Sequence, residues 1–254
     1  QLDLSYSLQK TDNDFPFYNR QLKKEDIRHN NNKFQQQFSL GLMIPINGYF
    51  ADYQCNYMTY KNNLPGTYNY SQAFAGSFIK GYSLKNILNI KSSLFKATQE
   101  MILYSNTDRN NYQNLKTSIP FYHANTRNYQ QVTGAKLALM IPFFSFENRN
   151  GLEYKNERFE STDILKPTAG IPMLTRDTYS GYTGLSKEID YQLFELISQA
   201  SVRMDYTKEF KNNYSWRIEQ IIKYYASIPV EIYFNYGSSF SLPSFYDLYW
   251  KGDS

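Results

Sequence analysis

Apolar and polar side chains alternate along most of this chain, in long runs that are separated by polar breaks. One run covers residues 33–46 and a second covers 49–60, with Asn47-Gly48 between them. Asn-Gly between two alternating runs is a strong signal for a β-hairpin with a two-residue turn. The second run predicts a strand with one apolar and one wet face. Its apolar face holds Tyr49, Ala51, Tyr53, Cys55 and Tyr57.

The same pattern predicts about eleven strands, near 2–10, 33–46, 49–60, 72–82, 86–99, 128–142, 145–158, 176–188, 191–206, 213–225 and 229–241. Further tight turns are expected at 82–85, 142–145, 188–190 and 226–229. Longer segments rich in Asn, Asp, Lys, Arg and Tyr cover 11–32, 61–71, 105–127, 159–175 and 207–213. Alternation of short and long connections is typical of a transmembrane barrel with short periplasmic turns and long extracellular loops.

The length of the predicted strands favours a membrane barrel. Most of them reach the roughly nine to eleven residues that a tilted strand needs to cross a bilayer, whereas strands of soluble proteins average about five to six. No run approaches the roughly twenty apolar residues of a membrane helix. The expected fold class is therefore all-β, an antiparallel transmembrane β-barrel. A soluble β-sandwich would pack the same apolar faces against each other, and it stays open as an alternative.

Composition and charge limit the functional classes. The formal charge of +4 is spread along the chain, which gives no nucleic-acid footprint. Cys55 is the only cysteine, so neither a disulfide framework nor a cysteine metal site is expected. No repeat or linker divides the 254 residues, and we expect one domain. Because the chain begins at Gln1 without an export signal, we expect its true N-terminus to be missing or processed.

Candidate chemistry is sparse. His29 and His123 are the only histidines, and neither has a metal-like spacing. No nucleophile triad, carboxylate pair or phosphate loop is recognisable, so we expect no enzyme, no cofactor and no bound metal. Aromatic faces beside amides and hydroxyls recognise bulky polar ligands, although outer-membrane loops are in general rich in Tyr and Asn. The candidate ligand-binding residues, all in predicted extracellular loops, are Tyr68, Tyr70, Tyr112 and His123.

Two further sets of residues have expected places in a barrel. Lumen-facing Arg203, Asp205, Glu195 and Glu231 are expected to pair with one another or with another domain, most simply as a charge ladder inside the wall. Aromatic residues near strand ends fit the girdles of outer-membrane barrels at the membrane interface. These are Trp216, Tyr249 and Trp250.

The segment 230–250 resembles the strand-to-loop signature of TonB-dependent outer-membrane receptors, Tyr-Gly-x-x-Phe-x-x-Pro-Ser-Phe-x-Asp-Leu-Tyr. A second stretch, 176–206, resembles paired strands of that family that end in an Arg-x-Asp-Tyr element, with Ser201 in place of a frequent Gly. The resemblance covers roughly 176–250, and residues 1–175 agree only in strand and loop rhythm. The matching residues, all structural, are Gly237, Phe240, Pro243, Ser244, Phe245, Asp247, Leu248, Tyr249, Arg203, Asp205 and Tyr206.

The resemblance implies a barrel of twenty-two strands with an N-terminal plug. About eleven strands is half of that, so the chain is expected to be part of a barrel domain, residues 1–254, with the plug absent. It further implies uptake of a metal chelate such as cobalamin or an iron-siderophore across the outer membrane of a Gram-negative bacterium. The implied partners are outer-membrane lipid, the chelate, and the TonB energy-transducing complex through the missing plug. The alternatives are a passive porin-like channel and a soluble glycan-binding β-sandwich.

Overall fold

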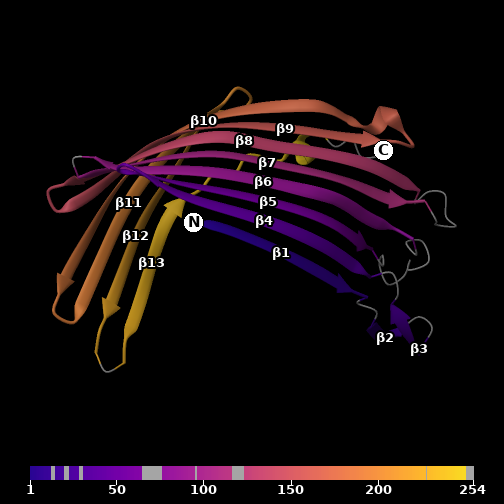
Figure 1. Cartoon of the computed structure of the whole chain (residues 1–254), viewed down its shortest axis with the longest axis horizontal. Coiled ribbons are helices and arrows are strands. Elements are labelled where there is room, and N and C mark those ends of the chain that lie inside the picture. Colours follow the sequence, from indigo (N-terminus) through magenta and orange to yellow (C-terminus); the bar gives the residue numbers. More distant parts are fainter. Residues whose placement is uncertain are drawn as a thin grey trace.

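The structure is a computed structural model that describes residues 1–12, 15–19, 23–28, 31–64, 76–94, 96–115, 123–226 and 228–249. Within these residues, eleven strands form one antiparallel sheet in the order β1-β4-β5-β6-β7-β8-β9-β10-β11-β12-β13 (Figure 1). Each strand of this sheet therefore pairs with the next sheet strand along the chain, and β2 and β3 lie between β1 and β4 in the sequence but form a separate sheet. The strands are β1 (Leu2–Thr11), β4 (Lys33–Ile46), β5 (Tyr49–Asn63), β6 (Phe78–Leu94), β7 (Ala97–Asn114), β8 (Ala124–Phe143), β9 (Phe146–Asp163), β10 (Ile171–Tyr191), β11 (Phe194–Thr207), β12 (Lys211–Tyr224) and β13 (Val230–Ser238).

Three smaller elements accompany the sheet. A separate hairpin pairs β2 (Phe15–Asn19) with β3 (Lys24–Arg28). The 3-10 turn η3 (Pro167–Ala169) precedes β10, and the short helix α1 (Phe245–Tyr249) follows β13. No helix in the described part of the chain is long and apolar enough to cross a membrane.

The sheet curves into an arch, as expected of part of a barrel wall (Figure 1). Among the described residues β1 pairs only with β4 and β13 pairs only with β12, so the arch has two free edges. The expected fold class, a partial antiparallel barrel of about eleven strands, is confirmed. A sandwich needs a second sheet packed on the apolar face, and the described residues provide none.

The tight turns lie at one end of the sheet, because every second connection of an antiparallel meander returns to the same end. Asn47 and Gly48 adopt φ of 30° and 86°, the left-handed pair of a type I′ hairpin turn. The turn expected near 142–145 is also correct. The chain reverses between the end of β12 and the start of β13, as expected at 226–229, although residue 227 lies outside the described residues. The turn expected at 188–190 lies instead at 192–193, where Gln192 has φ of 48°.

The turn expected at 82–85 is wrong. β6 runs without interruption through these residues, and the chain reverses after Leu94. Gly81, the residue before the expected turn, lies on β6 and permits close packing against the next strand. A Cβ added there would collide with the backbone carbonyl of Arg109 on β7.

Several expected loops are partly strand. β6 to β10 are 17 to 21 residues long, so parts of 105–127 and 159–175 continue the ladder. The polar side chains there do not interrupt pairing, because the backbone groups of each strand bond to both neighbours. The barrel wall therefore extends past the expected membrane region, toward the long connections.

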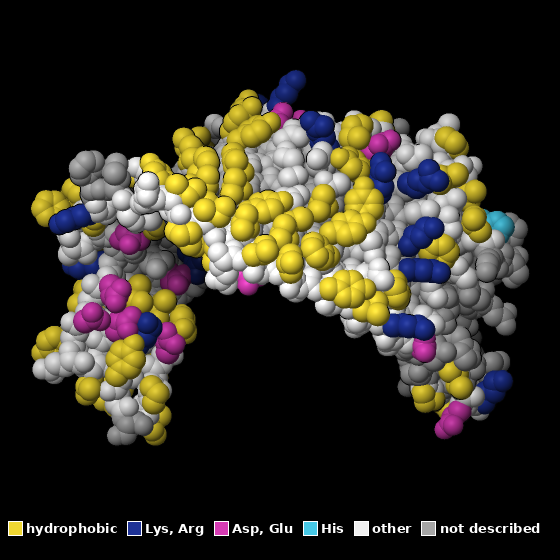
Figure 2. All heavy atoms as spheres, viewed as in Figure 1, with side chains coloured by type: hydrophobic (Ala, Val, Ile, Leu, Met, Phe, Trp, Pro, Cys, Tyr) yellow, Lys and Arg dark blue, Asp and Glu magenta, His cyan; other side chains and the backbone are white. Residues whose placement is uncertain are grey.

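The pairing register separates an apolar outer face from a polar inner face. Ile90, Met101, Leu137 and Leu152 are successive partners across four strands, and Leu152 is 66% exposed. Figure 2 shows hydrophobic side chains as a belt across the sheet, with Lys and Arg along one side of it. A large exposed apolar belt is costly in water and favourable against lipid, so this face is the membrane surface.

Candidate functional site

The inner face of the arch carries a network of charges centred on Arg203 of β11. Its guanidinium donates to Asp205 Oδ1 at 2.9 Å, to Glu153 Oε2 at 3.0 Å and to Ser180 Oγ at 2.8 Å. Ser180 Oγ donates in turn to Asp205 Oδ1 at 2.5 Å, and Tyr104 Oη donates to Glu153 Oε1 at 3.0 Å. One cation thus links carboxylates on β9 and β11 to side chains of β7 and β10, and fixes their arrangement.

A second cluster joins the inner wall to the segment after β13. Arg176 on β10, with a side chain 7% exposed, donates from Nε to Glu157 Oε2 at 3.0 Å and from Nη1 to the carbonyl of Pro243 at 2.9 Å. Its guanidinium lies 4.7 Å from the ring centroid of Phe245. That ring stacks on Phe159, with centroids 6.0 Å apart and planes at 7°. Residues 239–249 therefore fold back over the inner wall (Figure 1).

The start of α1 shows why this segment folds locally. Ser244 Oγ accepts from the backbone N–H of Asp247 at 3.1 Å, and it donates to Asp247 Oδ2 at 2.6 Å. The Asp247 carboxylate also accepts from the Ser244 N–H at 3.3 Å. This is a capping box, which satisfies the first free N–H groups of a helix. The Pro-Ser-Phe-x-Asp motif thus places Phe245 against Arg176.

The expected aromatic girdle is correct only in part. Trp216 lies on the outer face, where it contacts Tyr236 edge-on with centroids 5.3 Å apart. Tyr249 is not at the outer surface of the wall, because its ring stacks on Phe245 at 6.5 Å. Trp250 lies outside the described residues.

A third inner cluster surrounds Glu100 of β7, which is 9% exposed. Its carboxylate is 3.1 Å from Lys91 Nζ and 3.7 Å from Arg149, and accepts from Asn89 Nδ2 at 3.1 Å. A buried carboxylate is stable only with such partners. Lys91 and Arg149 come from β6 and β9, so this cluster ties three strands together.

At the end with the tight turns, Glu195 binds two partners. Lys223 Nζ is 2.6 Å from Glu195 Oε1, and Tyr225 Oη donates to Glu195 Oε2 at 2.5 Å. Tyr225 lies in the connection after β12, outside the strands. Its hydrogen bond to the carboxylate raises the pKa of the Tyr225 hydroxyl above its ordinary value, because a phenolate there would face a second negative charge.

A hollow of about 410 Å³ opens on the inner wall between β8 and β12. Its described lining has four cationic and two anionic side chains. Three of the cations are paired with carboxylates, Arg149 with Glu100, Arg203 with Glu153 and Asp205, and Arg217 with Glu219. Lys136 is the cation of this lining that makes no ion pair among the described residues, so it can attract an anionic solute. The charged lining residues are Lys136, Arg149, Arg203, Arg217, Glu147 and Glu219.

Tyr182 forms part of the wall of this inner hollow. Its ring lies over Gly151, where an added Cβ would collide with the ring. Lys136 Nζ is 5.4 Å from the Tyr182 ring centroid. The Tyr182 hydroxyl is buried and has no hydrogen-bond partner among the described residues. An unsatisfied hydroxyl beside an ammonium group is a position at which a polar ligand gains a hydrogen bond.

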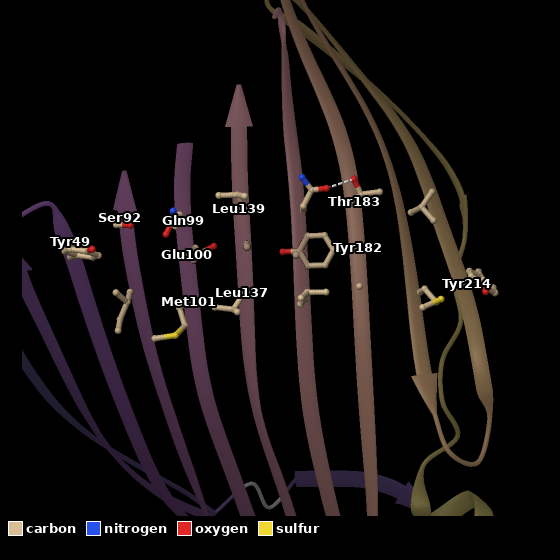
Figure 3. A pocket seen from close by; sticks show the side chains of 18 residues that line it. Tyr49, Ser92, Gln99, Glu100, Met101, Leu137, Leu139, Tyr182, Thr183 and Tyr214 are labelled. Carbon is tan, nitrogen blue, oxygen red and sulfur yellow. Dashed lines mark hydrogen bonds between the residues drawn. The ribbon is translucent and has the colours of Figure 1, made fainter. Parts of the chain in front are cut away.

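A larger and shallower hollow, of about 930 Å³, lies mainly on the outer face around Gly181. Figure 3 shows Met101, Leu137 and Leu139 on neighbouring strands of its wall, with the hydrogen bond between Thr183 and Asn150. Because most of its side chains belong to the apolar belt, this hollow contributes to lipid contact rather than to the inner path.

The structure describes two of the four candidate ligand-binding residues. Tyr68 and Tyr70 lie outside the described residues, as does His29. Tyr112 is not in a loop but on β7, with Ile79 and Thr126 as partners. His123 is exposed and directly precedes β8. The described part of the chain contains no group of three or more His, Cys, Asp or Glu that could hold a metal ion.

Arg203, Asp205, Glu195 and Glu231 were expected on the inner face and in pairs with one another, and the pair of Arg203 with Asp205 is confirmed. The structure pairs Arg203 with Asp205 and Glu153, and pairs Glu195 with Lys223. The sequence pattern did not identify Glu153 and Lys223 as partners. It also did not single out Arg176, Lys136 and Arg217 as cations of the inner face. The available signal was their position in the alternation, since charged residues in otherwise lipid-crossing strands belong to the inner face.

Comparisons with known proteins identify the fold. No known family and no curated protein matches the sequence. Among solved structures, the chain is similar to the copper transporter OprC, with a TM-score of 0.65 and 12% identity over 96% of this chain and 41% of that one. It is also similar to the outer membrane transporter YddB from Escherichia coli, with a TM-score of 0.55 and 8% identity over 93% of this chain and 39% of that one.

The chain thus spans about two fifths of the length of either transporter. At these identities the similarity concerns the fold, which is that of outer-membrane β-barrels. The predicted location, the outer membrane of a Gram-negative bacterium, is the location of this fold. Association with membrane lipid follows from the apolar belt and this fold together.

Proposed function

We propose that this chain is part of the barrel wall of a TonB-dependent outer-membrane receptor that takes up a metal chelate, such as cobalamin or an iron-siderophore. The observation that carries the proposal is the inner hollow on the concave side of a barrel wall, where Lys136 makes no ion pair among the described residues and lies beside the unsatisfied Tyr182 hydroxyl. The fold similarity to two transporters supports it, as does the resemblance of residues 176–250 to the receptor family.

The proposed arrangement needs more protein than this sheet. A twenty-two-stranded barrel is twice the described sheet, and the chain spans about two fifths of the two transporters. In this proposal the remaining strands and a plug belong to the same longer protein. The plug would meet the TonB complex, and the barrel itself would do no covalent chemistry.

The inner wall has two kinds of cation with different roles. Arg203 and Arg176 are bound by carboxylates, so they organise the wall. Lys136 has no ion pair among the described residues, and its ammonium faces the Tyr182 ring beside the inner hollow. A solute with carboxylate, catecholate or phosphate groups would exchange one weak contact for another as it passes, which favours transit over tight binding.

The test uses the full-length protein in its own outer membrane. Uptake of radiolabelled cobalamin and ferric siderophores is measured with TonB present, with TonB deleted, and after an uncoupler. The proposal predicts that a chelate is taken up when TonB is present, and that this uptake stops both when TonB is deleted and when the uncoupler is added. If small solutes were taken up equally with and without TonB, the receptor proposal would be wrong and the protein would be a passive channel.

The inner hollow is tested by Lys136→Gln, with Lys85→Gln as the matched control. Lys85 is exposed on the same inner face of β6 but lies outside the hollow. We expect Lys136→Gln to lower uptake of an anionic chelate several-fold and to leave a neutral one unchanged. Equal effects of the two substitutions would show that the inner hollow has no special part in transport.

A further inference from the structure

The outer face carries an ordered row of cations that transport through the inner wall does not use. By pairing register, Lys10, Phe34, Lys61, Lys80, Asn111 and Arg127 are successive neighbours across β1, β4, β5, β6, β7 and β8. We call these residues the outer cationic row. All four of its cations are exposed. Arg109 lies beside the row on the same face, two residues from Asn111 along β7.

In the part of the chain that the structure describes, no cation of this row makes an ion pair with an acidic side chain. Lys61 and Lys80 are direct cross-strand neighbours, and like charges in that position are destabilising. Neither of them, nor Arg109 or Arg127, makes an ion pair among the described residues. Both ammonium groups instead approach the ring of Phe78, at 5.0 and 5.8 Å from its centroid. An aromatic ring compensates such repulsion only in part.

The row borders a hollow of about 650 Å³. Four cations line it, Lys61, Lys80, Arg109 and Arg127, and Glu160 is the single acid among its described lining residues. Aromatic rings complete the wall, and Arg109 lies 5.6 Å from the ring of Tyr129. Lysine pairs and the planar fork of arginine are suited to phosphate oxygens.

The position of the row relative to the apolar belt identifies the kind of ligand. On β5, Lys61 lies four residues after the outward-facing Tyr57, which is about 13 Å along the strand. In a strand tilted by about 45°, this places Lys61 about 9 Å from Tyr57 along the bilayer normal. Figure 2 shows Lys and Arg side chains beside the hydrophobic belt. The row lies toward the long connections, the side that faces outward in such barrels.

We propose that the outer cationic row binds the phosphorylated head group of an anionic lipid in the outer leaflet, whose acyl chains lie along the apolar belt. A lipid supplies both required parts, a phosphate at the level of the cations and hydrocarbon just below it. Because the row faces away from the lumen, this inference is independent of the transport proposal.

The experiment compares lipid retention by the full-length protein. Protein in phosphatidylcholine nanodiscs is titrated with phosphatidic acid, and bound lipid is counted by native mass spectrometry after release. The double variant Lys61→Gln/Lys80→Gln is compared with Lys187→Gln as the matched control. Lys187 is also on the outer face and also lies over an aromatic ring, that of Phe146 at 5.0 Å, but near the tight turns.

We expect the double variant to bind phosphatidic acid about tenfold more weakly or worse, and the control to match the wild type. Because the double variant relieves a repulsion, it should fold at least as well as wild type, and its heat-modifiable migration on gels checks this. Equal phosphatidic acid binding by the double variant would overturn the proposal. So would displacement of the lipid by inorganic phosphate at equal concentration, since the site would then recognise a free anion.

Discussion

At the scale of single residues, Arg203 is the cation on which two carboxylates of the inner wall depend. Arg203→Ala would leave Glu153 and Asp205 without it. Because its side chain is 36% exposed, we expect a loss of about 1–2 kcal/mol in the free energy of unfolding, less than for a fully buried pair. Urea unfolding in lipid vesicles measures this. Arg203→Lys should recover only part of the loss, because one ammonium group cannot reproduce the fork. An unchanged unfolding midpoint in Arg203→Ala would contradict this role.

Phe245 is the residue that holds the segment after β13 on the inner wall. Phe245→Ala removes its contacts with Arg176 and Phe159, so we expect faster amide exchange across 239–249, including Leu248, whose N–H donates to the Ser244 carbonyl at 3.2 Å. Hydrogen–deuterium exchange with mass spectrometry measures it. Phe240→Ala is the control, since that motif phenylalanine is 43% exposed and should leave exchange unchanged. Equal exchange in both variants would show that the stacking does not hold the segment.

Residue contacts of this kind were beyond sequence reasoning. Arg203 and Glu153 are separated by 50 positions, and Arg176 and Pro243 by 67. The alternation places Arg203 on the inner face, but its partner follows from the pairing register of β9, β10 and β11 together. The contact of Arg176 with Pro243 depends on the return of the chain over the lumen, which an alternating pattern does not specify.

At the scale of elements, two strand glycines have opposite surroundings. A Cβ at Gly81 would collide with the backbone of β7, whereas at Gly181 the nearest atom is Leu152 Cδ2 at 3.7 Å. Gly81→Ala should therefore cost about 1–3 kcal/mol, and Gly181→Ala should be nearly neutral. Urea midpoints of the two variants in the same vesicles give the comparison. If Gly81→Ala lowered the urea midpoint no more than Gly181→Ala does, the close approach of β6 and β7 at Gly81 would be contradicted.

The main error in the predicted elements is the turn expected at 82–85, directly after Gly81. It displaced one hairpin by about ten residues, although the number of strands in the sheet was correct. Asn47-Gly48 was interpreted correctly because both residues adopt positive φ there. Sequence alone does not separate a glycine needed for left-handed backbone from one needed for close strand packing.

At the scale of the whole molecule, the described sheet leaves one edge of β1 and one edge of β13 without a paired strand. Exposed strand edges pair with other chains, so we expect residues 1–254 alone to form oligomers in detergent. Analytical ultracentrifugation measures the mass distribution. The full-length protein, in which we propose that both edges are paired, is the control and should be monomeric. A stable monomer of residues 1–254 would indicate that the edges close on each other.

The central claim is that the outer face meets lipid and the inner face meets water. Its most direct test is a cysteine scan of 135–139 on β8 in the full-length protein with Cys55→Ser, because Leu137 faces outward and its neighbours Lys136 and Ala138 face inward. A fluorophore at each position is exposed to nitroxides on lipid chains and to a water-soluble quencher. We predict alternation, with lipid quenching strongest at Ala135, Leu137 and Leu139 and aqueous quenching strongest at Lys136 and Ala138. The same quenching at all five positions, or the opposite alternation, would contradict the barrel wall described above.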